Sequence, residues 1–292
     1  MAPLAGKPVM AVTGANKGIG YEVARRLLSD HPDATVLVTS RNEERGKAAV
    51  GSLDNPRAKY MPLDVADPSS ITAWAGRVAA EHGRLDVLVL NAGVMGRSPS
   101  DTRQSVNVNY FGALRTVRAV EALLHAGSRV VAVSSRLGSL VAQPGDVLRT
   151  TLASPDLSID RLSQMMEDAA SAAEADGAAG LTAAGWKADP YAVSKVGLTT
   201  LLRLLGRDAR PPGVAYHAAC PGLTDTGDNT EMIKDLPGIV PLAQGADTVV
   251  WATTLGAGEG NGGFVADRRQ LDYADQGDMD SWKDAVPRED YV

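Results

Sequence analysis

A glycine-rich turn between an apolar run and a helical stretch limits the fold of this chain more than any other feature. Residues 9–13 form a short, mostly apolar run, and Gly14-Ala15-Asn16-Lys17-Gly18-Ile19-Gly20 follows at once. Gly14 would allow a sharp exit from a strand, Gly18 the approach of a phosphate to the backbone, and Gly20 close packing of the next helix. That helix, from about Ile19 to Leu28, would offer free N–H groups to an anion. The pattern predicts a strand–turn–helix unit that binds a pyrophosphate.

Apolar runs alternate with helical patterns through the first half of the chain. Further strands are predicted at residues 35–39, 60–63, 87–90 and 130–133, with helices from Glu43, over 69–80 and over about 103–125. The strand runs are continuously apolar, which is typical of strands covered on both faces. This order of elements predicts a parallel, doubly wound α/β sheet of Rossmann type.

The alternation breaks after residue 136. Residues 137–189 hold no convincing strand, and a probable helix near 159–175 precedes a run of small residues at 175–184. We interpret 137–189 as an insertion over one face of the sheet, because it has too few large apolar residues for a core of its own. The rest completes a single domain over 1–292, with a helix at 190–206, a strand at 214–219, a helix near 244–255, a last strand at 264–265 and an acidic tail at about 272–292.

Composition excludes several classes of protein. The 29 basic residues against 35 acidic ones give a net charge of -6, which argues against a nucleic-acid partner. One cysteine and four scattered histidines give no metal-site spacing, so we expect no metal. No apolar run approaches the roughly 18–20 residues that span a bilayer, and residues 1–7 lack a secretory pattern. We expect a cytoplasmic protein with a small-molecule partner, no nucleic acid and no membrane.

The end of the second predicted strand indicates which dinucleotide binds. A free ribose 2′-hydroxyl usually meets an acidic residue there, but this strand ends in Thr39-Ser40-Arg41. Arg41, Lys17 in the glycine turn and Arg45 one helical turn later would suit a 2′-phosphate. The alternative is three solvated surface cations paired with nearby glutamates. We predict NADPH rather than NADH.

A tyrosine and a lysine four residues apart open the predicted helix at 190–206. Tyr191 and Lys195 would share a helix face. A cation beside a phenol favours the phenolate and would lower the tyrosine pKa from about 10. Ser134-Ser135 after the fifth strand and Asn91-Ala92-Gly93 after the fourth are weak signals alone. Together, in this order on this fold, these motifs are specific.

With these motifs the sequence resembles the short-chain dehydrogenase/reductase family over about residues 7–270. The resemblance rests on residues 13–20, Leu63-Asp64-Val65, Asn91-Ala92-Gly93, Asn109, Ser135, Tyr191, Lys195 and Pro221-Gly222. Within the family the chain looks most similar to the monomeric carbonyl reductases. Asn16-Lys17 in the turn, Arg41 and Arg45 after the second strand, and the long insertion before Tyr191 carry that narrower similarity.

The resemblance implies roles for individual residues. Tyr191 would protonate a substrate carbonyl oxygen, Ser135 would hydrogen-bond it, and Lys195 would hold the nicotinamide ribose and lower the Tyr191 pKa. Asn109 would anchor a water that links Lys195 to solvent. The dinucleotide would lie against Gly14, Asn16, Lys17, Gly18, Ile19, Gly20, Arg41, Arg45, Asp64, Val65, Asn91, Ala92, Gly93, Tyr191, Lys195, Pro221, Gly222, Thr224 and Thr226.

The resemblance also leaves functional alternatives. Arg136, Leu137 and Leu223 would face the substrate, where Arg136 and Leu223 depart from the usual family residues. Arg136 would select an anionic or polar carbonyl compound, or simply face solvent. The leading hypothesis is an NADPH-dependent reductase of ketones, aldehydes or quinones. The alternatives are an NAD(P)-dependent alcohol dehydrogenase working in the oxidative direction and a non-catalytic NADPH sensor. Because the insertion would cover the helix used for dimerisation, we expect a monomer.

Overall fold

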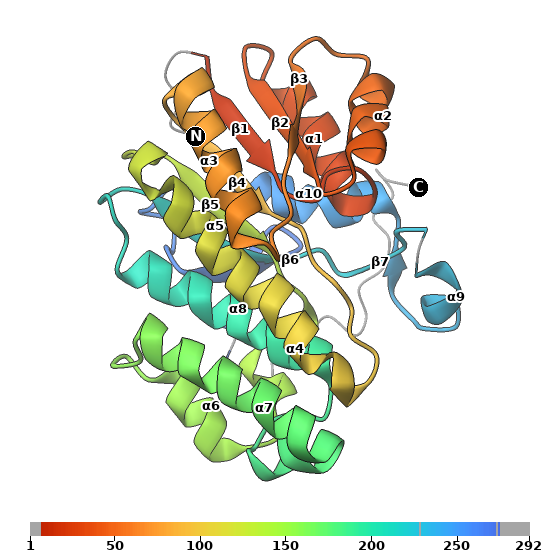
Figure 1. The fold of residues 1–292 in the computed structure, drawn as a ribbon, viewed down its shortest axis with the longest axis vertical. Coiled ribbons are helices and arrows are strands. Elements are labelled where there is room, and N and C mark those ends of the chain that lie inside the picture. Colours follow the sequence, from red (N-terminus) through yellow and green to blue (C-terminus); the bar gives the residue numbers. More distant parts are fainter. Residues whose placement is uncertain (1–6, 228, 273, 275–292) are drawn as a thin grey trace.

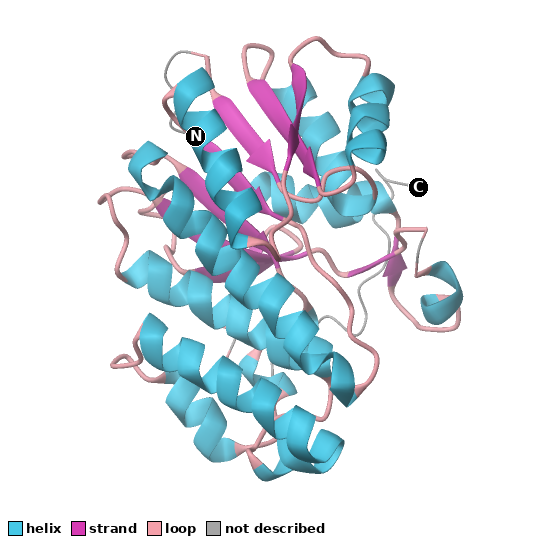
Figure 2. Ribbon diagram, in the orientation of Figure 1, coloured by secondary structure: helices cyan, strands magenta, loops and turns pink. Residues whose placement is uncertain are grey.

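A computed structural model describes residues 7–227, 229–272 and 274. Through these residues runs a sheet with the strand order β10-β9-β6-β5-β4-β1-β2-β3 (Figures 1 and 2). The predicted acidic tail, 272–292, lies outside the described residues apart from Asp272 and Ala274, and so do residues 1–6. The strands of the sheet are β1 (Val9–Val12), β2 (Thr35–Ser40), β3 (Ala58–Pro62), β4 (Val87–Leu90), β5 (Arg129–Val133), β6 (Ala215–Cys220), β9 (Gly263–Ala266) and β10 (Arg269–Leu271).

The order of the strands creates a crevice beside β1. From β1 the chain builds β2 and β3 on one side, then returns to build β4, β5 and β6 on the other. All these strands pair in parallel, as predicted. In such a sheet the connections diverge at the point where the order reverses, and ligands bind outside the carboxyl ends of the strands there. The glycine turn after β1 lies at this point.

Helices cover both faces of the sheet, which makes it doubly wound (Figure 1). One layer contains α1, α2 and α10, and the other contains α3, α5 and α8. The helices of the described residues are α1 (Gly18–Asp30), α2 (Glu43–Leu53), α3 (Pro68–His82), α4 (Thr102–Ser105), α5 (Gly112–Val120), α6 (Asp146–Ala153), α7 (Ile159–Ala183), α8 (Pro190–Arg207), α9 (Thr230–Ile233) and α10 (Leu242–Ala252).

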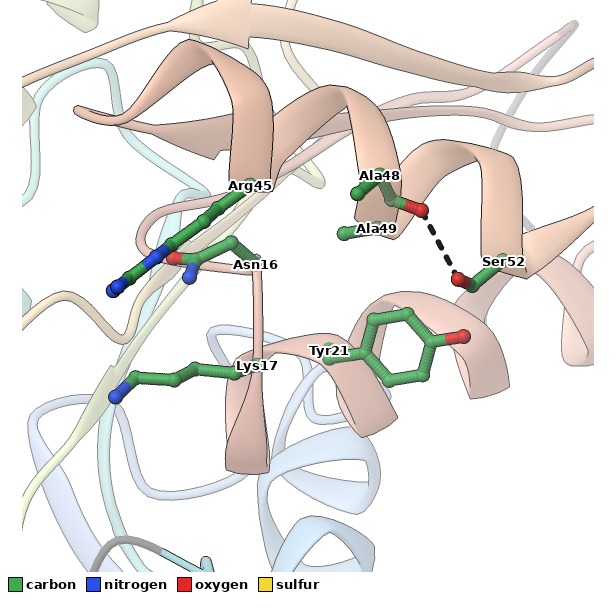
Figure 3. Close-up of a pocket in the computed structure, with 7 residues that line it drawn as sticks. All are labelled: Asn16, Lys17, Tyr21, Arg45, Ala48, Ala49 and Ser52. Atoms are coloured by element: carbon green, nitrogen blue, oxygen red, sulfur yellow. Dashed lines mark hydrogen bonds between the residues drawn. The ribbon is translucent and has the colours of Figure 1, made fainter.

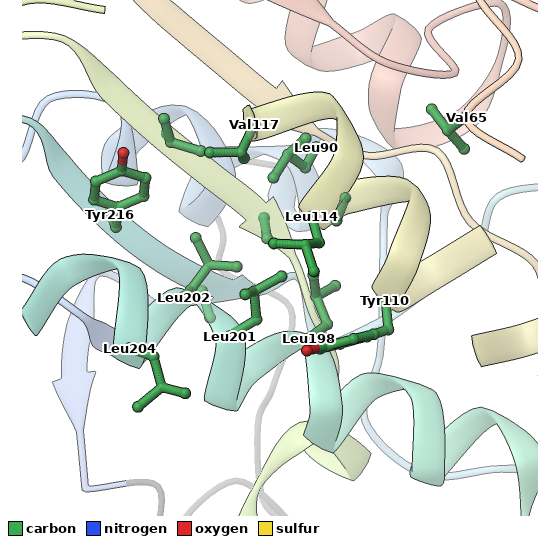
Figure 4. Packing of buried hydrophobic residues seen from close by; sticks show 14 of the residues in the cluster. Val65, Leu90, Tyr110, Leu114, Val117, Leu198, Leu201, Leu202, Leu204 and Tyr216 are labelled. Carbon is green, nitrogen blue, oxygen red and sulfur yellow. The ribbon is translucent and has the colours of Figure 1, made fainter. Parts of the chain in front are cut away.

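The side chains of the strands pack into two separate hydrophobic cores, one on each face of the sheet. Met10 and Val12 point into the cluster beneath α1 and α10, whereas Val9 and Ala11 point into the cluster beneath α3, α5 and α8. Successive side chains of a strand face opposite sides of the sheet, so both sides of β1 must be apolar. Figure 4 shows the second cluster, where leucines of α8 meet Leu114 and Val117 of α5. This packing presses α8, which carries Tyr191 and Lys195, onto the sheet.

The insertion between β5 and α8 differs from its prediction in two ways. It contains two helices, α6 and α7, and α7 continues through the small-residue run to Ala183 with a kink at Gly177 (φ 59°). The insertion packs on α8 and not directly on the sheet, because α8 already covers that face (Figure 1). Met166 of α7 is fully buried and contacts α8 at Gly197, where a Cβ atom would overlap its sulfur.

The helix predicted over about 103–125 is interrupted. It begins as α4, passes through a π-helical segment at Val106–Phe111, continues as α5 and ends at Val120 in a 3₁₀ turn, Glu121–Leu123. A π turn holds one residue more than an α turn, so it rotates the side chains that follow. The segment contains Asn109, whose side chain is turned into the protein interior.

Three short strands were not predicted. β10 pairs antiparallel with β9, with Gln270 opposite Val265. β7 (Leu223–Thr224) and β8 (Ile239–Val240) form a two-stranded parallel sheet outside the main one. These strands are only two or three residues long, too short to leave a periodic signal. Among the described helices, none is long and apolar enough to cross a membrane.

Candidate active site

The predicted site residues follow the carboxyl ends of four neighbouring strands. The glycine turn follows β1, Asn91-Ala92-Gly93 follows β4, Ser135 follows β5 and Pro221-Gly222 follows β6. Because these strands are parallel neighbours in the order β6-β5-β4-β1, their ends meet along one edge. Tyr191 and Lys195 join them from the first turns of α8.

The glycine turn is crowded in the way the sequence predicted. Gly14 and Gly18 have left-handed φ angles of 63° and 56°. A Cβ atom on Gly14 would lie 2.9 Å from the Ala92 backbone, and one on Gly20 would overlap the Asn91 amide. The N-cap residue of α1, Lys17, makes no side-chain capping bond to that first turn. The turn therefore has the shape that a pyrophosphate needs: close backbone approach and a helix N-terminus without a side-chain cap.

Asn91 has a structural role that the sequence did not indicate. Its Nδ2 donates to the carbonyl oxygens of Thr13 (2.8 Å) and Gly14 (3.1 Å). In return, Thr13 Oγ1 accepts from the backbone N–H groups of Asn91 and Ala92, both at 2.9 Å. The end of β4 thus holds the glycine turn in shape. A contact of Asn91 with an adenine ribose stays a prediction.

A surface cavity of ≈ 560 Å³ opens beside the glycine turn (Figure 3). Two cations, Lys17 and Arg45, and the amide of Asn16 line one end, and their side chains extend in the same direction in Figure 3. Arg41, predicted to share this site, is exposed and does not line the cavity. The cavity is lined by Asn16, Lys17, Tyr21, Arg45, Ala48, Ala49 and Ser52.

Asp64 and Val65 lie in the loop between β3 and α3. Asp64 Oδ1 accepts a hydrogen bond from the Ala66 backbone N–H at 2.9 Å. The Asp64 backbone N–H in turn donates to Ser70 Oγ at 2.9 Å. Val65 is buried, and a Cβ atom on Gly112 at the start of α5 would lie 2.8 Å from its carbonyl oxygen. These contacts fix the loop, and its predicted contact with adenine stays a prediction.

Ser135, Tyr191 and Lys195 come together at the end of β5. Ser135 is the N-cap of a short 3₁₀ helix, Arg136–Gly138, and its hydroxyl lies near enough to the Tyr191 phenol to oppose the rise of the Tyr191 pKa. Lys195 Nζ lies 5.5 Å from the centroid of the Tyr191 ring. The ammonium donates to the Val133 carbonyl oxygen at 2.6 Å, one bond that partly offsets its burial.

The predicted direction of the Tyr191 pKa shift is wrong in this structure. Desolvation raises the pKa of Tyr191, the neighbouring Cys220 and Asp189 raise it further, and the side chain of Ser135 opposes them. The Lys195 ammonium is directed to a backbone carbonyl and not to the phenol oxygen. Burial lowers the pKa of Lys195 to about 8, against a small opposing effect of Cys220. At neutral pH the phenol therefore keeps its proton.

Asp189 contributes to the site from the N-cap of α8. One carboxylate oxygen accepts from the backbone N–H groups of Tyr191 (2.9 Å) and Ala192 (3.1 Å). An aspartate directly before the first residue of a helix is a common N-cap. This residue could therefore have been found from the sequence. Its carboxylate holds the first turn of α8, on which Tyr191 stands.

Asn109 braces the neighbouring loop. Its Nδ2 donates to the Val94 carbonyl oxygen (2.9 Å) and to Ser194 Oγ (2.8 Å), and its Oδ1 accepts from the Val94 N–H (2.8 Å). Ser194 is the residue before Lys195, so Asn109 connects α8 to the segment after β4. Both amide hydrogens are in use, and the predicted water-anchoring role stays a prediction.

The segment after β6 lies over the glycine turn. A Cβ atom on Gly18 would lie 3.6 Å from Thr226 Cβ. Thr226 is held by Asn229, whose Oδ1 accepts from the Thr226 N–H (2.9 Å) and whose Nδ2 donates to the Thr224 carbonyl oxygen (2.9 Å). Pro221 accepts a hydrogen bond from Thr224 Oγ1 at 3.0 Å. Asn229 was not predicted, because nothing in the sequence marks a loop asparagine as the organiser of its neighbours.

Three residues predicted to face the substrate are half-buried around this edge. Arg136 and Leu137 belong to the 3₁₀ helix after Ser135, and Leu223 begins β7. The charge of Arg136 acts on the thiol of Cys220, which is fully enclosed and whose pKa burial raises to about 12. Cys220 is therefore a neutral thiol beneath the site at neutral pH.

Comparisons with known proteins agree with this geometry. The model of the short chain dehydrogenase family matches residues 8–147. The carbonyl reductase (NADPH) 3 of Mus musculus is 32% identical, over 89% of this chain and 96% of its own length. This chain belongs to the short-chain dehydrogenase/reductase family. The short-chain dehydrogenase/reductase 1 of Saponaria officinalis is 30% identical, over 89% of this chain and 94% of its own length.

Solved structures of the family share the fold. The menthone neomenthol reductase of Mentha piperita superposes with a TM-score of 0.76 at 25% identity, over 90% of this chain and 99% of its own. The salutaridine reductase of Papaver somniferum gives a TM-score of 0.78 at 24% identity, over 89% of this chain and all of its own. The doubly wound sheet of this chain is thus the family fold.

Proposed function

We propose that this short-chain dehydrogenase/reductase is an NADPH-dependent carbonyl reductase in which Tyr191 donates the proton. The observation that carries the proposal is the gathering of three side chains at the end of β5: the Ser135 hydroxyl acts on the Tyr191 phenol, and Lys195 Nζ lies 5.5 Å from the centroid of its ring. Both hydroxyl groups lie on the edge of the sheet that also carries the glycine turn. As a family member whose curated relatives include NADPH carbonyl reductases, the chain is an oxidoreductase.

The residues at the crevice fit NADPH. Gly14 and Gly20 let the turn pack closely on Ala92 and Asn91, and Gly18, with its left-handed φ of 56°, would let a pyrophosphate approach the backbone. Lys17 and Arg45 line the adjoining cavity and would hold the 2′-phosphate, with Asn16 as a hydrogen-bond partner. Thr224 and Thr226 would hold the nicotinamide end, and Lys195 the ribose. NADPH, when bound, supplies the hydride.

The residues of the chain supply the proton and the polar contacts to the substrate. Ser135 would hydrogen-bond the carbonyl oxygen and orient it. The O–H bond of Tyr191 would break as the oxygen gains negative charge, giving the alcohol and leaving a phenolate. The Lys195 ammonium, 5.5 Å from the ring, would stabilise that phenolate until solvent returns a proton. The substrate pocket would include Arg136, Leu137 and Leu223, and we propose a ketone, aldehyde or quinone as substrate.

We also infer a cytoplasmic monomer. In the part of the chain that the structure describes, α7 packs on α8 through Met166 and covers a face of that helix. Arg103 of α4 binds α7 as well, with an ion pair to Glu167 at 2.9 Å and a hydrogen bond to Glu174 at 2.8 Å. A second copy would have to displace α7 to reach this face of α8.

Replacing Tyr191 by Phe tests the proton donor. We expect kcat for carbonyl reduction to fall by a factor of about 100 or more, because general-acid catalysis contributes on that scale. The Kd for NADPH, measured by fluorescence, should change less than about twofold. The matched control is Tyr110→Phe, which removes a buried phenol that is hydrogen-bonded to Ser163 at 2.9 Å. Turnover of Tyr191→Phe at the rate of this control would contradict the assignment.

Replacing Arg45 by Ala tests the 2′-phosphate site. A charge-assisted hydrogen bond contributes about 1.5–3 kcal/mol, so we expect the KM for NADPH to rise about tenfold or more, with the KM for NADH unchanged. Lys47→Ala is the control, because Lys47 lies on the same helix but pairs with Glu43 at 2.7 Å, outside the cavity lining. Equal effects on both dinucleotides would show that Arg45 does not contact the phosphate.

The oligomeric state is tested by sedimentation equilibrium. At micromolar protein we expect the mass of one chain, 30.5 kDa. A mass of about twice that value would show that the chain dimerises although α7 covers this face of α8, and would contradict the prediction.

A further inference from the structure

A buried pair of hydroxyl groups joins α8 to the strand end that carries Ser135. Ser134 Oγ and Thr199 Oγ1 lie 2.6 Å apart, and each residue is 2% exposed. Ser134 precedes Ser135 in the chain, and Thr199 lies one helical turn beyond Lys195. The pair therefore connects the segment that carries Ser135 with the helix that carries Tyr191, and the distance between the two side chains depends on it.

The direction of this hydrogen bond follows from counting protons. Thr199 Oγ1 donates to the Lys195 carbonyl oxygen at 3.0 Å, and a hydroxyl has one proton to give. Ser134 must therefore be the donor to Thr199. Ser134 is itself fixed to the sheet, because its backbone N–H donates to the Ala219 carbonyl oxygen of β6 at 2.7 Å. A directed chain runs from the sheet through two hydroxyls to the backbone of Lys195.

Gly138 closes this arrangement from the 3₁₀ helix after Ser135. A Cβ atom there would overlap Ser134 Oγ, lie 2.5 Å from Thr199 Oγ1 and lie 3.0 Å from the Lys195 carbonyl oxygen. The first two atoms are the hydroxyl pair itself, and the third belongs to the backbone of α8. Any side chain at 138 would push the Ser135 loop and α8 apart.

We propose that the pair Ser134–Thr199, closed by Gly138, is a positioning device that holds α8 at the spacing Ser135 and Tyr191 need for proton transfer. This rests on the proposed function. None of the three residues needs to touch substrate or cofactor. The pair acts together with the bond from Lys195 Nζ to the Val133 carbonyl oxygen, one residue before Ser134. Two anchors one helical turn apart fix both the position and the rotation of α8.

The test compares Thr199→Val with Thr200→Val. Thr200 is also fully buried on α8 and donates the same kind of bond, to the Val196 carbonyl oxygen at 2.8 Å. None of the hydrogen bonds found for Thr200 reaches another element, so the two variants differ in the bond to Ser134. We expect Thr199→Val to lower kcat about tenfold with the substrate KM within twofold, because misalignment costs transition-state contacts. Thr200→Val should stay within twofold of the parent, and Thr199→Ser should restore activity.

Two further measurements keep the proposal independent of folding and of turnover. Gly138→Ala should lower kcat in the same way as Thr199→Val while near-UV circular dichroism stays native. In protein labelled with [¹³Cζ]tyrosine, the Tyr191 resonance should shift in Thr199→Val and not in Thr200→Val, because the position of the phenol relative to Ser135 changes. If Thr199→Val matches Thr200→Val in both kcat and the Tyr191 resonance, the pair has no positioning role. If Tyr191→Phe keeps full turnover, it is the proposed function that fails.

Discussion

The attachment of α8 to the carboxyl end of β5 is the contact on which the site depends. α8 buries one face of leucines against the sheet, and this packing takes the Lys195 ammonium out of water. A buried ammonium is costly unless it is hydrogen-bonded, and Lys195 meets the Val133 carbonyl oxygen at 2.6 Å. The same packing desolvates Tyr191 and brings it to Ser135. Core formation and the properties of the reacting groups thus have one cause.

A second set of contacts shapes the other half of the crevice. The end of β4 clamps the glycine turn after β1 through Asn91 and Thr13, and the loop after β6 approaches it through Thr226. These segments are far apart in sequence but follow adjacent strands. A parallel sheet brings them together without any segment needing structure of its own. The glycine turn and the Ser135–Tyr191 pair are then held at a distance set by the strands between them.

Much of this architecture was predictable from local pattern. The apolar runs predicted as strands at 9–12, 35–39, 87–90 and 130–133 are strands in the structure, and Gly14 in the turn that follows the first has a left-handed φ angle. β7, β8 and β10 were missed because two or three residues carry no period. The second half of α7 was missed because alanine and glycine give no apolar stripe, and its helical form shows only in the structure.

The sequence predicted that these side chains lie together, but not their electrostatics. Tyr191 and Lys195 were paired by their spacing and Ser135 was added by the family resemblance, whereas the direction of the Tyr191 pKa shift depends on burial and on where the Lys195 ammonium points. The bracing roles of Asn91 and Asn229 rest on contacts with backbone carbonyls and N–H groups, which no side-chain pattern encodes. The sequence indicates which side chains are present, and their packing determines their pKa values and hydrogen-bond partners.

The most direct test of the account is a pH titration of Tyr191 in protein labelled with [¹³Cζ]tyrosine. The chain has 7 tyrosines, and Tyr191→Phe assigns the resonance by its loss. Because desolvation raises the pKa of Tyr191, the account predicts that its phenol is still neutral at about pH 10, where an ordinary tyrosine is half ionised. A phenolate resonance for Tyr191 at about pH 7 would contradict it.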